Sequence, residues 1–232
     1  MTWDEIIEQG RARALDFGAD WPSATSVLYR RIQVRQQEIF STANRINPDY
    51  FGQNTVGALD ANGDVNMASL DVEGSVVDPT AAVTRVEIQN PGSHPTLVRG
   101  DEVAIIPHND PDAGIAPRMT LRSFILHAYC GDMDGVSSVC IYYGFRPALK
   151  PMPMDGSETS DLPSVYDELL VLDVTKFLVK LTMELATERK VAALGVVQEE
   201  IDAMLTTFIA EVADYAGAQV SRFGSVVGGQ RT

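Results

Sequence analysis

The chain has 232 residues, of which 45% are hydrophobic, enough to bury a substantial core as one domain or two closely joined layers. Its 32 acidic residues against 18 Lys and Arg give a formal net charge of -14, which argues against a protein that grips nucleic acid through the phosphates. The acidic start lacks the pattern of a secretion signal and no later apolar run is long enough to span a bilayer, so a cytoplasmic protein without a membrane segment is expected.

The N-terminal region is predicted to form a helical hairpin. Thr2 and Glu5 have the spacing of a capping box, which predicts a helix from about Thr2 to Phe17. A glycine-containing break follows, and after Trp21 a second helix is predicted from apolar residues that fall largely on one face. These apolar residues are Val27, Leu28, Ile32, Val34, Ile39 and Phe40.

Residues 51–150 change character, because glycine, proline and β-branched residues become frequent and the apolar period shortens to two. Asn62-Gly63 predicts a tight turn between two strands. Cys130 and Cys140 flank another predicted turn, and in a reducing compartment two buried free thiols are expected there rather than a disulfide. Further strands are predicted at residues 82–89, 102–107, 119–129 and 137–145.

The C-terminal region begins with a polar stretch, residues 146–163, whose four prolines favour an extended path along a surface. Two long helices are predicted after it, and the first is expected to be capped by Asp161 or Ser164, with Pro163 in its first turn. They are expected to pair antiparallel with each other and with the N-terminal hairpin. Their apolar stripes are Leu170, Val174, Phe177, Leu178, Leu181 and Leu185 in the first, and Val197, Ile201, Leu205, Phe208, Ile209, Val212 and Tyr215 in the second.

Together these patterns predict an α+β fold, in which a helical bundle of about four main helices carries an inserted antiparallel β module. The bundle is assigned to residues 1–50 and 151–220, and the β module to residues 51–150. Residues 221–232, which have no helical periodicity, are expected to form a flexible C-terminal tail.

No motif for phosphate binding, zinc binding or acyl transfer is present, so neither catalysis nor a cofactor is expected. The best metal candidate is the loop with His108, Asp110 and Asp112, joined by His94 or His127. A solvated loop in which Asn, Asp and Pro make turns is favoured over a metal site there. His127 lies in a strand pattern, where one ring nitrogen is expected to be hydrogen-bonded in a structural role.

Two stretches carry a resemblance to a known family. In residues 2–46, a short helix ends in an Asp-rich turn before Trp21, and a second helix follows with many Gln and Arg residues. In residues 140–181, a Tyr-rich strand passes through Arg146-Pro147 and a polar proline loop into "DLPSVYDELL" and a helix. With a last long helix after them, these stretches resemble the head-to-tail adaptor (connector) proteins of tailed bacteriophages.

The resemblance implies a structural virion protein without catalytic activity. Such adaptors form a ring, typically a dodecamer, beneath the portal, where they extend the DNA channel and offer a platform to tail, nozzle or stopper proteins. The implied partners are the portal protein, a tail or stopper protein and further copies of the chain, with DNA only passing through the channel and no membrane. The implied location is the head-tail junction of the virion, after assembly in the host cytoplasm.

The resemblance also implies a portal-docking tail, and the start of the first long helix offers a second contact region. The tail is expected to dock on the portal and to order on contact. Tyr166 and Asp167, at the start of the first long helix, are expected to reach a neighbouring subunit. The tail residues concerned are Ser221, Arg222, Phe223, Gly224, Val226, Val227, Gly228, Gly229, Gln230 and Arg231.

Two alternatives remain open at this point. The first is a phage or host binding module whose β insertion grips a partner protein while the helices serve as a scaffold. The second is a metal-dependent hydrolase that uses His94, His108, Asp110 and Asp112. Ring formation or portal binding would favour the adaptor, a monomer with one specific partner the binding module, and metal retained after dialysis the hydrolase.

Overall fold

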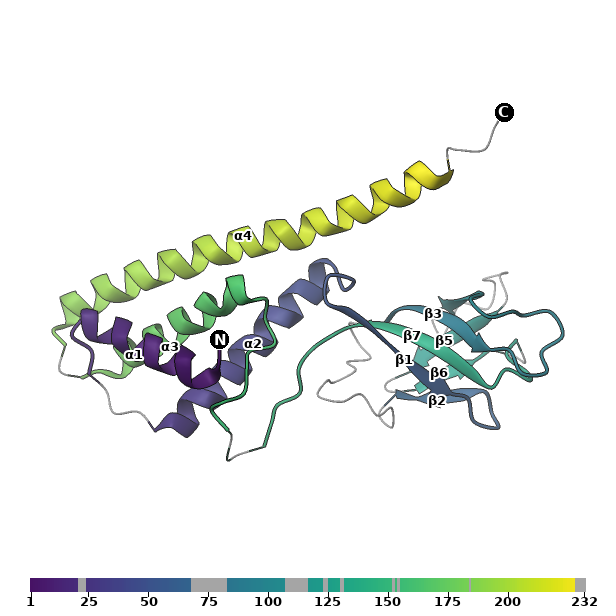
Figure 1. Ribbon diagram of the computed structural model, residues 1–232, viewed down its shortest axis with the longest axis horizontal. Helices are drawn as coiled ribbons and strands as arrows, with labels where there is room; N and C mark the ends of the chain where they lie inside the picture. The colour runs from purple at the N-terminus through teal and green to yellow at the C-terminus, as the bar shows by residue number, and fades with distance from the viewer. Residues whose placement is uncertain are drawn as a thin grey trace. The chain divides into compact units, whose positions relative to one another are not determined.

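The computed structural model describes residues 1–20, 24–67, 83–106, 117–122, 125–129, 132–151, 153, 155–183 and 185–227, with the backbone alone from 216 to 227. The chain divides into two compact units (Figure 1). The helical unit consists of Met1–Thr42 and Pro147–Thr232, and the β unit of Ala43–Arg146. The β unit therefore includes the last residues of the second helix, ahead of the predicted module boundary at residue 51.

The structure describes four α-helices and a short 3₁₀ helix at Ser164–Tyr166. The predicted capping box at the first helix is confirmed, because the Glu5 N–H donates to Thr2 Oγ1 at 3.2 Å and the Thr2 N–H donates to the Glu5 carboxylate at 2.7 Å. The break after this helix is confirmed as well, with Gly18 at a φ of 76°. The helices are α1 (Trp3–Asp16), α2 (Thr25–Ile46), α3 (Asp167–Leu181) and α4 (Thr187–Val227).

The central helix of the helical unit is α3, which is buried on several sides and not along one stripe. On one side it packs closely against α1, where a Cβ added to Gly10 would lie 2.6 Å from Val174 Cγ1. On another side Leu172 packs against Val197 and Ile201 of α4. Because both neighbours bury apolar residues against it, α3 holds this unit together.

The predicted cap of α3 is wrong. The 3₁₀ helix precedes α3, and neither helix start has a side-chain cap hydrogen bond. The Asp161 carboxylate instead accepts a hydrogen bond from Gln36 Nε2 of α2 at 2.6 Å. Gln36 is buried, so its amide needs a partner, and this tertiary bond replaces the local cap.

The β unit contains seven described strands in the order β1-β7-β3-β4-β5-β6-β2. All neighbours pair antiparallel except β4 and β5, which run parallel. The strands at the two ends of this order come close together, since a Cβ added to Gly57 of β1 would lie 2.5 Å from Val65 Cγ1 of β2. The strands are β1 (Gly52–Ala58), β2 (Asp64–Asn66), β3 (Val83–Asn90), β4 (Glu102–Ile106), β5 (Arg118–Arg122), β6 (Ile125–Ala128) and β7 (Ser138–Gly144).

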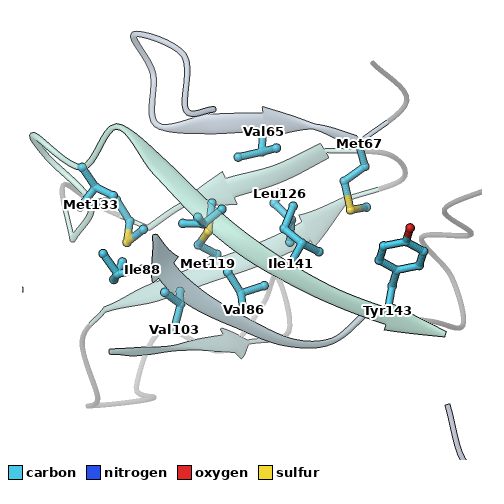
Figure 2. Close-up of a cluster of buried hydrophobic side chains, with 12 residues drawn as sticks. Val65, Met67, Val86, Ile88, Val103, Met119, Leu126, Met133, Ile141 and Tyr143 are labelled. Carbon is cyan, nitrogen blue, oxygen red and sulfur yellow. The ribbon is translucent and has the colours of Figure 1, made fainter. Parts of the chain in front are cut away.

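The β unit has a hydrophobic core of its own, to which most of its strands contribute buried side chains (Figure 2). Alternate residues of β7, among them Val139 and Ile141, point into it, as expected for a strand with one buried face. Cys140 on the same strand is a buried free thiol, as predicted, whereas Cys130 lies outside the described residues. The core residues are Val65, Met67, Val86, Ile88, Val103, Met119, Leu126, Met133, Val136, Val139, Ile141 and Tyr143.

The predicted fold class, a helical bundle with an inserted antiparallel β module, is therefore wrong. The seven described strands form a mixed, nearly closed, barrel-like sheet, and the fold combines this sheet with four helices. The reason is that a strand pattern specifies which side chains are buried but not the direction of the strand. Eleven residues, 107–117, connect β4 to β5, and a connection of this length can return the chain to begin a parallel strand.

Two strand pairings also differ from the prediction. The turn at Asn62-Gly63 is present, with Gly63 at a φ of 79°, but its flanking strands do not pair with each other. β1 pairs along its whole length with β7, which offers a longer ladder than the three residues of β2. Residues 119–129, predicted as one strand, contribute to the antiparallel pair β5 and β6.

Candidate functional site

Tyr166, predicted to contact a neighbouring subunit, is buried inside the helical unit. Its ring packs edge-on against Phe208 of α4, with ring centroids 4.8 Å apart at an angle of 73°. Its hydroxyl donates a hydrogen bond to the carboxylate of Glu211, one turn further along α4. Tyr166 thus fastens the start of α3 to the middle of α4.

Asp167 is also buried, and its described partner lies in the same chain. Its Oδ2 is 2.5 Å from the amino group of Met1, and its Oδ1 has no hydrogen-bond partner. Both side chains therefore have partners within the chain. Their contact with a neighbouring subunit stays a prediction.

Two tyrosine hydroxyls are held in their neutral form by carboxylates. Burial and the hydrogen bond to Glu211 raise the pKa of Tyr166 to about 12. The hydrogen bond to Asp4, together with burial, raises the pKa of Tyr29 to about 12. Because both values exceed the pKa of about 10 for an unfolded tyrosine, the stabilisation from the two hydroxyls is complete below about pH 10. It is lost as the pH rises through about 12.

We therefore expect the folded protein to contain tyrosines that ionise only near pH 12 in an ultraviolet absorbance titration. Tyr166→Phe and Tyr29→Phe should each remove one ionising group from that late phase, with circular dichroism reporting that the fold persists. Ionisation of every tyrosine around pH 10 in the folded chain would contradict the two hydrogen-bonded hydroxyls.

Three glutamines of α2 hold the polar segment of residues 147–162, which we call the strap. The start of α1 binds the strap as well, because the Trp3 N–H donates to the Glu158 carbonyl at 2.9 Å. The strap is therefore fixed to two helices of its own unit. The glutamine bonds run from Gln33 Nε2 to the Lys150 carbonyl, from Gln37 Nε2 to the Pro147 carbonyl and from Gln36 Nε2 to the Asp161 carboxylate.

Two valines of α2 were expected on its buried face and are instead exposed. Val27 is 47% exposed and Val34 is 37% exposed. The buried face of α2 contains Leu28 and Ile32 together with Gln33 and Gln36, and the two valines lie on the other side of the helix. The apolar pattern alone misplaced them, because buried glutamines occupy positions that a hydrophobicity pattern assigns to the surface.

These valines line a groove of about 620 Å³ between α2 and α3, which we call the α2–α3 groove. Arg31 lies along it, held by two hydrogen bonds to Asp173 at 2.5 and 2.8 Å and with its guanidinium 5.7 Å from the centre of the Phe177 ring. Arg30 is exposed beside it. The described lining contains no acidic side chain, and it consists of Ser26, Val27, Arg30, Arg31, Val34 and Phe177.

The C-terminal segment, predicted as a flexible tail, begins as a continuation of α4. The backbone of residues 221–227 is helical, so Ser221, Arg222, Phe223, Gly224, Val226 and Val227 lie in the last turns of that helix. Gly228, Gly229, Gln230 and Arg231 lie outside the described residues. The portal-docking role of all ten residues stays a prediction.

The histidines of the metal hypothesis are only partly described. His127 Nδ1 lies 3.0 Å from Asp64 Oδ2 across the β2 and β6 pair, as expected for a structural histidine. His94 Nδ1 accepts the Leu97 N–H at 3.1 Å within a turn. His108, Asp110 and Asp112 lie outside the described residues, and the described ranges hold no group of three His, Cys, Asp or Glu side chains suited to a metal ion.

Neither a protein-family model nor a curated protein matches the chain. Among the described residues, no helix combines the length and the apolar character needed to cross a membrane.

Proposed function

We propose that the chain is a structural virion protein, a head-to-tail adaptor that assembles as a ring under the portal, extends the DNA channel and supports a tail or stopper protein. The observation that carries this proposal is the length of α4. This helix has 41 residues, against 14 in α1 and 15 in α3 (Figure 1). The last of its described side chains to be buried is Val212, and residues 213–215 are exposed.

The helix backbone continues from Val212 to Val227, a distance of roughly 22 Å at 1.5 Å per residue. The sequence over this part differs from the rest of the chain. From Tyr215 to Thr232 it contains Arg222, Arg231 and many small or apolar residues, and no acidic residue, although the chain has 32 of them. A helix end with this composition is suited to insert into a groove of another protein.

The order of elements gives the proposal further support. The two stretches that resemble the adaptors correspond to α1 with α2, and to β7 followed by the strap and α3. The correction to the fold class concerns the β unit, whereas most of the resembling residues belong to the helical unit. The net charge of -14 also suits a channel wall, because acidic side chains around a lumen would repel DNA phosphates and let the duplex slide.

Removal of residues 221–232 is expected to abolish binding to the cognate portal ring while leaving the fold intact. The cut lies well beyond Val212, so the described core of the helical unit is preserved. Binding would be measured by co-sedimentation with portal rings, and the fold by circular dichroism. A folded, truncated chain that still co-sediments with the portal would reject this tail as the anchor.

A point variant sharpens the same test. Arg222→Glu is expected to weaken portal binding by about tenfold, because it replaces a positive charge of the docking segment with a negative one. Arg189→Glu, the same change near the other end of α4 at an exposed position, is the matched control and should bind like the wild type. Equal binding by both variants would place the portal contact elsewhere.

A further inference from the structure

The α2–α3 groove presents an apolar surface interrupted by positive charge. Val27 and Val34 are separated by seven residues, which is two helical turns or about 10 Å, and both are exposed. Arg30 lies between them on the exposed side of α2, and Phe177 of α3 forms the opposite wall. Exposed valines at this spacing, next to an aromatic ring, are typical of a surface that receives a helix.

The arginines make this groove an exception within an acidic chain. Arg31 is neutralised by Asp173, but Arg30 hydrogen-bonds only a neutral group among its described contacts, Gln33 Oε1 at 3.2 Å. Glu38, further along α2, is paired with Arg35 at 2.9 Å. The positive charge of Arg30 therefore favours an occupant that is apolar and acidic.

The outer face of α4 has this composition. The inner face, which includes Val197, Phe208 and Val212, is buried. On the outer side Val191 is 64% exposed and Ile209 is 39% exposed, and their separation of eighteen residues places them on one face of the helix. Asp202 lies seven residues before Ile209 on that face and is exposed.

Within one copy, the described parts of α2 and α4 do not pack side by side. α4 packs its inner face on α3, where Val197 and Ile201 contact Leu172, and its outer face lies about a quarter turn around the helix and is exposed. Each copy thus offers one groove and one outer face, which is the arrangement of a heterologous, head-to-tail contact. Such contacts generate a closed ring when the rotation between neighbours closes.

We propose that the α2–α3 groove of one copy binds the outer face of α4 of a second copy, with Asp202 facing Arg30 and Ile209 packing against Val34. This contact rests on the proposed function, since it names the surfaces by which neighbouring copies of the ring would meet. The occupant is a second copy, because the outer face of its α4 carries acidic and apolar side chains that match the positive and apolar lining of the groove.

Charge reversal tests the contact in the full chain. Arg30→Glu and Asp202→Arg are each expected to weaken self-association by at least about tenfold, because each places like charges against each other. The double variant restores an opposite pair and is expected to recover most of the association. The association constant would be measured by sedimentation over a concentration series, with circular dichroism as the check on folding.

Arg45→Glu is the matched control, because it makes the same charge change at an exposed position of α2 outside the groove lining. It should self-associate like the wild type. Three results would overturn the proposal: a wild-type chain that remains monomeric at the highest concentrations, single reversals with no effect, or a double variant that recovers nothing.

Portal co-sedimentation of the same variants separates this inference from the proposed function. Self-association with the expected charge dependence but without portal binding would keep the groove contact and reject the adaptor. Portal rings that bind all variants with equal occupancy would keep the adaptor and reject the groove contact.

Discussion

Replacing Gly10 by alanine is expected to destabilise the helical unit, whereas the same change at Gly195 is expected to stabilise it. Alanine in a helix interior is normally favoured over glycine by up to about 1 kcal/mol, because the unfolded chain loses freedom. A Cβ at Gly195 of α4 would meet nothing within 4 Å, so this gain should appear in full. At Gly10 the same atom would lie 2.6 Å from Val174 Cγ1 and 3.3 Å from the Val171 carbonyl oxygen.

The contact at Gly10 involves a β-branched side chain and backbone, neither of which can swing away, so α1 and α3 must move apart. We expect a net loss of about 1–3 kcal/mol in the free energy of unfolding, as is usual for overpacking. Urea unfolding followed by circular dichroism would measure both variants. A Gly10→Ala protein at least as stable as the wild type would show that α1 does not lie this close to α3.

Phe208→Ala is expected to cost about 3–5 kcal/mol of stability, the range for deleting a large buried aromatic side chain. Phe208 is fully buried and supports the Tyr166 ring, so its loss leaves a cavity between the start of α3 and the middle of α4. Ile209→Ala, at the next position, removes a side chain on the outer face of the helix. We expect that change to cost less than about 1 kcal/mol.

The two variants also separate folding from assembly. Phe208→Ala should lower the urea midpoint strongly, while Ile209→Ala should leave it nearly unchanged and weaken self-association instead. Equal losses of stability from the two neighbouring positions would mean that α4 packs with a different face than the one described.

The local elements of this fold were largely predictable because their signals lie within a few residues. The capping box of Thr2 and Glu5 predicted the start of α1, and alternating apolar residues predicted β3, β4 and β7. The apolar stripe of α4 was predicted correctly at Val197, Ile201, Phe208 and Val212.

The predictions were wrong where residues far apart in the sequence determine how strands pair or which partner a side chain binds. The parallel pairing of β4 with β5, and the pairing of β1 with β7, depend on which strand is available in space. Asp161 lost its predicted cap role because a glutamine from α2 reaches its carboxylate. The sequence pattern around a single strand or helix start does not specify these long-range pairings.

The candidate contact surfaces, the C-terminal segment and the α2–α3 groove, were likewise only partly predictable from the sequence. The resemblance to the adaptors implied the C-terminal segment as a contact region, and its last described turns prove to be the continuation of α4. The apolar pattern of α2 assigns Val27 and Val34 to the core and therefore does not predict the α2–α3 groove. The signal that could have revealed it is the set of Gln33, Gln36 and Gln37, whose side chains hold the strap and so identify the side of α2 that faces inward.

Electron microscopy of the full chain mixed with its cognate portal ring tests the central claim most directly. The proposal predicts a second ring of density beneath the portal, which disappears when residues 221–232 are removed from an otherwise folded chain. Portal rings that remain bare in the presence of the folded full-length chain would contradict the adaptor function.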